Sequence, residues 1–109
     1  MGVVRNVTKA GNGVLPKAGD NITVHCTGIL ADGNKKFWST LDDNKPFAFR
    51  VGKGQVIRGW DEGMLQMSVG EEADLTMTGD YAYGPKGFPA WGIPPNATLI
   101  FKIQMLKIN

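Results

Sequence analysis

Apolar and polar residues alternate along several short runs of this chain, and this alternation restricts it to a fold built mainly from half-buried strands. The clearest run extends from Asn21 to Leu30, where Ile22, Val24 and Cys26 occupy every second position and polar residues lie between them. Successive side chains of a strand point to opposite faces of a sheet, so this spacing predicts one buried face. Similar runs predict further strands near positions 3–7, 36–39, 47–51, 73–77 and 98–108.

Residues 51–64 are the only convincing helix candidate. Ile57 and Trp60 are three residues apart and Met64 follows four residues later, which is the spacing of one helix face. Gly59 and Gly63 lie within the same stretch, although each weakens a helix by about 1 kcal/mol relative to alanine. Their presence predicts that the helix backbone packs closely on the sheet and that Trp60 points into the space that the sheet encloses.

Together these patterns predict the α+β class: a curved antiparallel sheet of about five strands whose apolar face is covered by one short α-helix. The chain has 109 residues, which is enough for one hydrophobic core that needs no stabilisation by a disulfide bond or a bound metal. We therefore expect residues 1–109 to form a single domain.

Composition excludes several classes of function. The formal net charge is only +2, and Lys35 and Lys36 are the only adjacent basic pair, so we expect no nucleic-acid partner. No apolar run approaches the roughly 18 residues that span a membrane. The single cysteine cannot form an internal disulfide and the first residues show no secretion signal, so we expect a cytoplasmic protein.

The side chains of the common catalytic and metal sites are also missing. His25 is the only histidine, so neither a Ser-His-acid triad nor a multi-histidine metal site can form, and we expect a surface or hydrogen-bonded structural histidine. Cys26 lies on the apolar face of its strand, where cysteine is usually inert. The acidic pairs at 42–43 and 71–72 lack calcium-site spacing, and we expect them to be solvated. We predict no metal and no cofactor.

Aromatic residues are the remaining functional signal. The segment from Asp80 to Asn96 is long for a connection in so short a chain and contains Tyr81, Tyr83, Phe88 and Trp91. Loops of this length are usually functional or disordered, and this aromatic content argues against disorder. Aromatic residues of the strands and of the helix could converge with the aromatic residues of this loop. We expect one of them, Phe49, simply to fill the core. The pattern predicts an apolar pocket with a few polar groups at its edge.

Several short motifs resemble one known family. The segments VIRGWDEG (56–63), DYAYG (80–84) and IPPNATLIF (93–101) are similar in sequence and order to the FKBP family, the macrolide-binding peptidyl-prolyl isomerases. VHCTG (24–28), KPFAF (45–49) and VGKG (51–54) fit the same pattern. The resemblance covers essentially the whole chain and is to the minimal, single-domain cytosolic type. It implies an antiparallel sheet half-wrapped around one short helix, which the alternation indicates independently.

The resemblance also implies roles for individual residues. Trp60 would form the floor of a proline pocket, the Tyr83 hydroxyl would bind a substrate carbonyl, and the backbone N–H of Ile57 would bind another. The walls of the pocket and its cover would come from Phe37, Phe47, Val56, Ile57, Phe101, Ile93 and the loop from Phe88 to Gly92.

Five positions depart from the commonest family pattern. Cys26 stands where many members have a pocket tyrosine, Trp38 where many have an aspartate, Gln55 where glutamate is frequent, and Phe88 where some have histidine. The segment at Trp91 is one residue longer. We expect catalysis to tolerate these changes better than macrolide affinity does, because a ligand hydroxyl that loses its aspartate partner costs on the order of 1 to 3 kcal/mol.

Two functions therefore remain open. The first is a peptidyl-prolyl isomerase that acts on proline-containing peptides and unfolded proteins and also binds macrolides such as rapamycin and tacrolimus. The second is a non-catalytic module that uses the same pocket to dock on a protein partner. In either case we expect a monomer.

Overall fold

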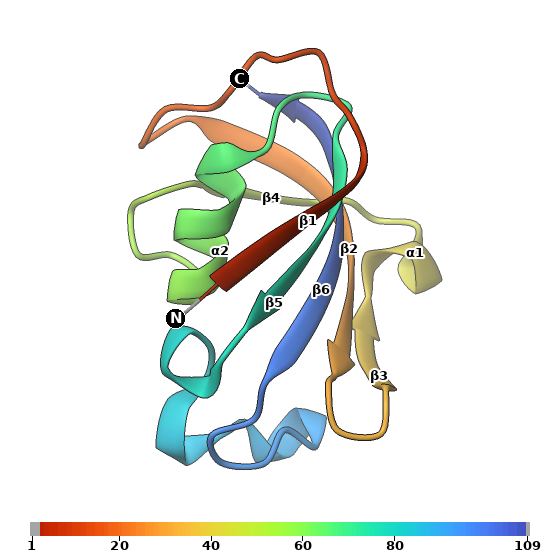
Figure 1. Cartoon of the computed structure of the whole chain (residues 1–109), viewed down its shortest axis with the longest axis vertical. Helices are drawn as coiled ribbons and strands as arrows, with labels where there is room; N and C mark the ends of the chain where they lie inside the picture. The colour runs from red at the N-terminus through yellow and green to blue at the C-terminus, as the bar shows by residue number, and fades with distance from the viewer. Residues whose placement is uncertain (1–2, 109) are drawn as a thin grey trace.

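The computed structural model describes residues 3–108 and shows a six-stranded antiparallel sheet beside one short helix (Figure 1). Five strands lie in the order β1-β5-β6-β2-β3, and β4 pairs with β2 outside this path. The predicted α+β class with a curved antiparallel sheet and one main helix is confirmed. The strands are β1 (Val3–Lys9), β2 (Asn21–Leu30), β3 (Lys35–Ser39), β4 (Phe47–Arg50), β5 (Glu72–Met77) and β6 (Leu99–Ile108).

The strand predictions agree closely with the observed elements. β2 has the predicted bounds, and Ile22, Val24 and Cys26 are buried while the residues between them are partly exposed. β6 repeats this pattern, with alternate residues from Leu99 to Met105 buried. β2 and β6, the two longest strands, pair along most of their length at the centre of the sheet. The two clearest alternation patterns in the sequence therefore belong to central strands.

The helix prediction was too long. The helix α2 extends only over Arg58–Gly63 and is continued by a 3-10 turn, η1 (Met64–Gln66). The residues before it form turns, because Gly52 and Gly54 have φ values of 78° and 75°. The carboxylate of Asp61 accepts the backbone N–H groups of both glycines, at 2.9 and 2.8 Å, and so fixes this turn against the helix.

The segment expected to be a polar loop before Pro46 contains a second, four-residue helix, α1 (Thr40–Asp43). The Ser39 hydroxyl accepts the N–H of Leu41 at its start, and Asn44 ends it in the left-handed conformation with φ of 51°. Serine at the N-cap and asparagine after the last turn are common helix signals. The helix is so short that periodicity could not reveal it.

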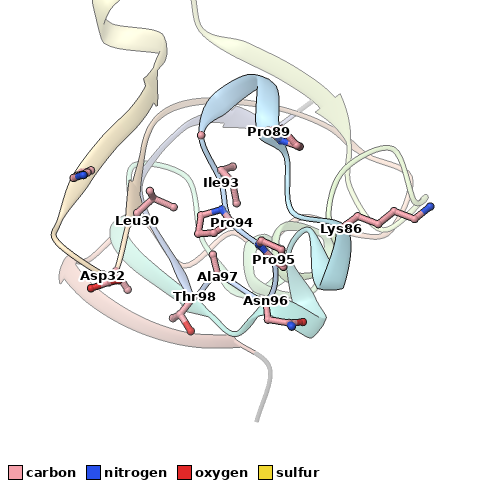
Figure 2. Close-up of a pocket in the computed structure, with 13 residues that line it drawn as sticks. Leu30, Asp32, Lys86, Pro89, Ile93, Pro94, Pro95, Asn96, Ala97 and Thr98 are labelled. Carbon is pink, nitrogen blue, oxygen red and sulfur yellow. The ribbon is translucent and has the colours of Figure 1, made fainter.

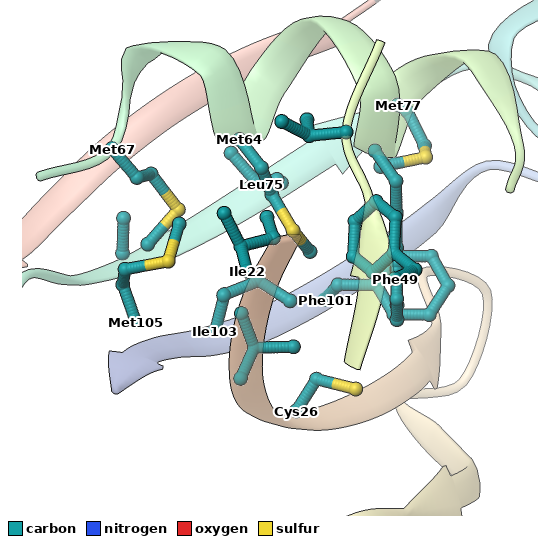
Figure 3. Packing of buried hydrophobic residues seen from close by; sticks show 14 of the residues in the cluster. Ile22, Cys26, Phe49, Met64, Met67, Leu75, Met77, Phe101, Ile103 and Met105 are labelled. Atoms are coloured by element: carbon teal, nitrogen blue, oxygen red, sulfur yellow. The ribbon is translucent and has the colours of Figure 1, made fainter. Parts of the chain in front are cut away.

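The core lies between α2 and the sheet and is rich in methionine (Figure 3). Trp60 and Phe49 are both buried, as predicted, with exposed fractions of 4% and 5%. The helix glycines approach the sheet closely: a Cβ at Gly59 would lie 2.8 Å from Met77 Cε, and one at Gly63 would lie 2.9 Å from Leu75 Cδ1. The predicted close packing is confirmed.

The prediction that both acidic pairs are solvated was wrong for Glu71. Its side chain is buried, forms an ion pair with Arg5 at 2.7 Å and accepts the N–H of Ser68 at 3.1 Å. A strand alternation pattern could not find this partner, which lies 66 residues away. His25, in contrast, is hydrogen-bonded as predicted: its Nδ1 lies 2.9 Å from the Thr40 hydroxyl.

Candidate functional site

An apolar pocket of about 440 Å³ opens above Trp60, at one end of α2. The Phe101 ring meets the Trp60 ring edge to face at a centroid distance of 5.1 Å, and Phe47 does the same at 5.7 Å. The pocket is lined by Trp38, Phe47, Gly54, Gln55, Val56, Ile57, Trp60, Tyr83, Trp91 and Phe101. Nine of the residues predicted for the site therefore meet here, and the glycine is the only one that was not predicted.

The turn before α2 supplies one wall. The Gln55 side chain accepts the N–H of Arg50 at 3.0 Å, and the following residues Val56 and Ile57 are half-buried. The Ile57 carbonyl accepts the N–H of Trp60 at 3.0 Å, whereas its own N–H takes part in none of the loop and turn backbone hydrogen bonds found between residues 3 and 108. Within residues 3–108, this N–H at the pocket wall therefore has no backbone acceptor.

A bulge in β3 supplies the opposite wall. Gly28 pairs with Trp38 and Ile29 pairs with Lys36, so Phe37 is an extra residue in the edge strand. Bulges of this kind redirect side chains, and here both Phe37 and Trp38 pack against Trp91, at 6.0 and 5.7 Å. Gly28 makes room for the Phe37 ring, since a Cβ there would lie 2.6 Å from that ring.

The loop from Asp80 to Asn96 closes the aromatic set. It is not structureless, because it contains the 3-10 turns η2 (Gly79–Tyr81), η3 (Gly84–Lys86) and η4 (Pro89–Trp91). The Tyr83 ring stacks on Phe88 at 5.3 Å, and Phe88 meets Trp91 edge to face at 5.0 Å. Phe88 and Ile93 also exchange both backbone hydrogen bonds, at 2.8 and 3.1 Å, which fixes the loop beside the pocket.

Four predicted site residues do not line the pocket. Phe37 and Phe88 contact residues of the lining instead: the Phe37 ring lies 5.8 Å from that of Phe101, and the Phe88 ring lies 5.3 Å from that of Tyr83. Cys26 is 1% exposed in the core, and burial raises the pKa of its thiol to about 12. Ile93 is 2% exposed and faces a different hollow.

That second hollow is the larger one, with a volume of about 1060 Å³ (Figure 2). It lies between the end of β2 and the proline-rich part of the loop, and Figure 2 shows Pro89, Pro94 and Pro95 along it. None of its lining residues is aromatic. Aromatic rings pack well against a ligand ring, and we therefore take the Trp60 pocket as the candidate site.

The Trp60 pocket contains few groups that could transfer a proton. Among the described residues that line it, Tyr83 has the only ionisable side chain, and burial raises the pKa of the phenol above its ordinary value of 10.0. Trp60 Nε1 is buried and has no hydrogen-bond partner, the single such side-chain atom in the described part of the chain. No cluster of potential metal ligands occurs among residues 3–108, and none of the helices there is long and apolar enough to cross a membrane.

An antiparallel sheet packed on one short helix, with an aromatic pocket beside that helix, is the architecture that the resemblance of the sequence implied. The sequence model described as FKBP-type peptidyl-prolyl cis-trans isomerase matches residues 13–106. The chain belongs to this family.

Curated relatives match the chain over its whole length. The peptidyl-prolyl cis-trans isomerase FKBP12 of Arabidopsis thaliana is 54% identical over 112 residues, which is all of both chains. A peptidyl-prolyl cis-trans isomerase of Schizosaccharomyces pombe is 56% identical over 110 residues, covering 100% of this chain and 96% of the relative. The FK506-binding protein 1A of Aspergillus fumigatus is 54% identical with the same coverage.

Proposed function

We propose that this chain accelerates rotation about X-Pro peptide bonds by binding the proline ring on Trp60, without covalent or acid-base chemistry. The observation that carries this proposal is the pocket itself. Its lining, as far as residues 3–108 form it, combines a buried indole floor and aromatic walls with a single ionisable group, the Tyr83 phenol.

The chemistry of the reaction suits such a pocket. Rotation about an amide bond faces a barrier of about 18 to 20 kcal/mol because resonance holds the bond planar, and uncatalysed X-Pro rotation takes tens to hundreds of seconds. The twisted amide has lost that resonance and is less polarised than the planar one. An apolar pocket therefore favours the twisted state relative to water, and this differential binding lowers the barrier.

Individual residues have separate tasks in this proposal. Trp60 holds the proline ring, with Phe47, Val56 and Phe101 around it. The Tyr83 hydroxyl and the Ile57 N–H donate to the carbonyls on either side of the rotating bond. Phe37 supports Phe101, and Phe88 supports Tyr83, through their ring contacts.

The same pocket accounts for macrolide binding, which we propose as a second property. The relative from Aspergillus fumigatus is named an FK506-binding protein, and its similarity extends over this whole chain. FK506 is the macrolide tacrolimus, and we expect both tacrolimus and rapamycin to bind on Trp60 in competition with peptide. We further propose a single-domain, monomeric protein of the cytoplasm that assists protein folding.

A non-catalytic docking module is the alternative, since the pocket could hold a proline-containing loop of a partner. A protease-coupled assay with a short X-Pro peptide separates the two functions. We expect the wild-type chain to accelerate isomerisation, and tacrolimus to abolish the acceleration. Binding of the peptide without any acceleration would favour the docking function.

A further inference from the structure

Asn96, the last residue of the loop that carries Tyr83, adopts a backbone conformation that few residues accept. Its φ of 58° lies in the left-handed region. Asparagine enters this region more readily than most residues, whereas a β-branched residue almost never does. The Asn96 side chain is exposed, and its backbone contacts the loop in two places.

These two contacts lie on either side of Tyr83, within residues 79–88, which we call the tyrosine segment. The N–H of Asn96 donates to the carbonyl of Gly84, the residue after Tyr83, at 2.8 Å. Gly79, at the start of the segment, lies so close to Asn96 that a Cβ built on it would be 2.7 Å from Asn96 Cα. The backbone of Asn96 therefore holds the segment both before and after the tyrosine.

The residues before Asn96 form a stiff support, and Figure 2 shows them in succession along the larger hollow. Pro94 and Pro95 have φ angles that their rings fix. Ile93 is 2% exposed and exchanges both backbone hydrogen bonds with Phe88, at the far end of the tyrosine segment. A Cβ at Gly87 would lie 2.8 Å from the carbonyl carbon of Pro94, so the two chains are in close contact.

The Tyr83 side chain depends on this support for its place in the pocket lining. Its ring stacks on Phe88 at 5.3 Å, and its backbone directly precedes the carbonyl that Asn96 binds. A change of the backbone angles at Asn96 would move Gly84 and Gly79 relative to Ile93, and Tyr83 would move with them.

We propose that Asn96 is a positioning residue for the isomerisation. Its left-handed backbone holds the tyrosine segment so that the Tyr83 hydroxyl meets the substrate carbonyl. This inference rests on the function proposed above, in which Tyr83 donates to that carbonyl.

Turnover of an X-Pro peptide by Asn96→Val and Asn96→Gly tests this inference. Valine resists the left-handed conformation, and we expect kcat/KM to fall about tenfold, because small misplacements of a group that contacts the substrate are costly. Glycine accepts the conformation and keeps the N–H, so we expect Asn96→Gly to retain kcat/KM within about twofold. Asn34→Val is the matched control: Asn34 has a φ of 51° in the turn between β2 and β3. It should lower Tm, as Asn96→Val does, and leave kcat/KM unchanged.

A double-mutant cycle with Tyr83→Phe separates positioning from a general loss of structure. We expect Asn96→Val to have almost no further effect on kcat/KM in the Tyr83→Phe background, because the hydroxyl that it misplaces is already absent. An equal loss in both backgrounds, or no loss in either, would overturn the inference. If Asn96→Val does not fold, Asn96→Ala decides by the same cycle.

Nuclear Overhauser contacts between the Tyr83 and Phe88 rings give a measurement that does not depend on activity. We expect these contacts to weaken in Asn96→Val and to persist in Asn96→Gly and Asn34→Val. Unchanged contacts in Asn96→Val would overturn the inference. Failure of the wild-type chain to accelerate isomerisation would count against the proposed function, whereas the ring contacts would still decide whether Asn96 positions Tyr83.

Discussion

Cys26 illustrates how little chemical reactivity the buried side of this sheet retains. Its thiol is 1% exposed, and burial raises its pKa from 9.0 to about 12. The thiolate is the reactive form of cysteine, so a thiol of this kind is a poor nucleophile at neutral pH. The expectation of an inert cysteine from its place on the apolar face of the strand agrees with this environment.

The raised pKa of Cys26 makes part of the stability of the protein depend on pH. In the unfolded chain the thiol loses its proton near pH 9, whereas in the folded chain it keeps the proton until about pH 12. The folded state therefore binds more protons in this window, and its stability falls as pH rises, by up to about 1.4 kcal/mol per pH unit.

Urea unfolding of the wild-type chain and Cys26→Ala, at about pH 8 and about pH 10, checks this expectation. The other titrating groups are common to both proteins and cancel in the difference. We expect the stability advantage of the wild-type chain to shrink at the higher pH. An advantage that stays constant would show that the thiol ionises equally in both states.

At the scale of single elements, the start of α2 depends on one carboxylate. Asp61 lies inside the helix but accepts the N–H groups of Gly52 and Gly54, so it ties the preceding turn to the helix that carries Trp60. The turn continues through Val56 and Ile57, which form the pocket wall. The sequence placed Asp61 in an early helical turn but gave no sign of these two bonds, which is why the predicted helix began too early.

Asp61→Asn tests this connection. The amide of asparagine can accept one N–H with its oxygen, but its NH₂ group faces the other N–H and cannot accept. We expect the free energy of unfolding to fall by about 1 to 2 kcal/mol. We also expect kcat/KM for an X-Pro peptide to fall, because the pocket wall is held less firmly.

Glu62→Gln is the matched control for Asp61→Asn. Glu62 is the next residue of the same helix, and its ion pair with Arg58 at 2.5 Å is exposed on both sides. Exposed pairs of this kind contribute little, so we expect this variant to keep the stability and activity of the wild-type chain. Equal effects of the two substitutions would mean that the hydrogen bonds from Asp61 to the turn do not stabilise the pocket wall.

At the scale of the whole molecule, the pair of Arg5 and Glu71 joins the first strand to the turn that precedes β5. Glu71 Oε2 accepts from Arg5 Nη1 at 2.7 Å, while Oε1 accepts the N–H of Ser68. The Glu71 carboxylate is 6% exposed and the Arg5 side chain 31%. β1 is an edge strand with mostly exposed residues, and besides its backbone pairing with β5 this ion pair is more buried than its side-chain contacts with Glu72.

Loss of this attachment should destabilise the protein. We expect Glu71→Gln to cost about 2 kcal/mol, because it leaves Arg5 with a weaker, uncharged partner. For a chain of this size that corresponds to a fall in Tm of roughly 6 to 12 °C, measurable by calorimetry. Glu72→Gln is the control, since Glu72 is 40% exposed and lies 3.9 Å from Lys9. A similar Tm for both variants would contradict the assigned role of Glu71.

The sequence predicted most of this architecture because strands leave a local, period-two signal. It also predicted nine of the ten residues that line the pocket, mainly through the resemblance to the FKBP family, which implied the non-aromatic Gln55, Val56 and Ile57 as well as the aromatic residues. It missed what depends on distant partners: the Arg5 and Glu71 pair, the β3 bulge, and the stacking of Trp38 between Trp60 and Trp91. No local pattern encodes these contacts.

The pH dependence of kcat/KM for an X-Pro peptide tests the central claim most directly. The described lining of the pocket contains only one ionisable side chain, Tyr83, and its pKa lies above 10.0. A mechanism of burial and differential binding therefore predicts an acceleration that is constant from about pH 6 to about pH 9. A bell-shaped or sigmoidal profile in that range would reveal an acid or a base in the reaction and would contradict this mechanism.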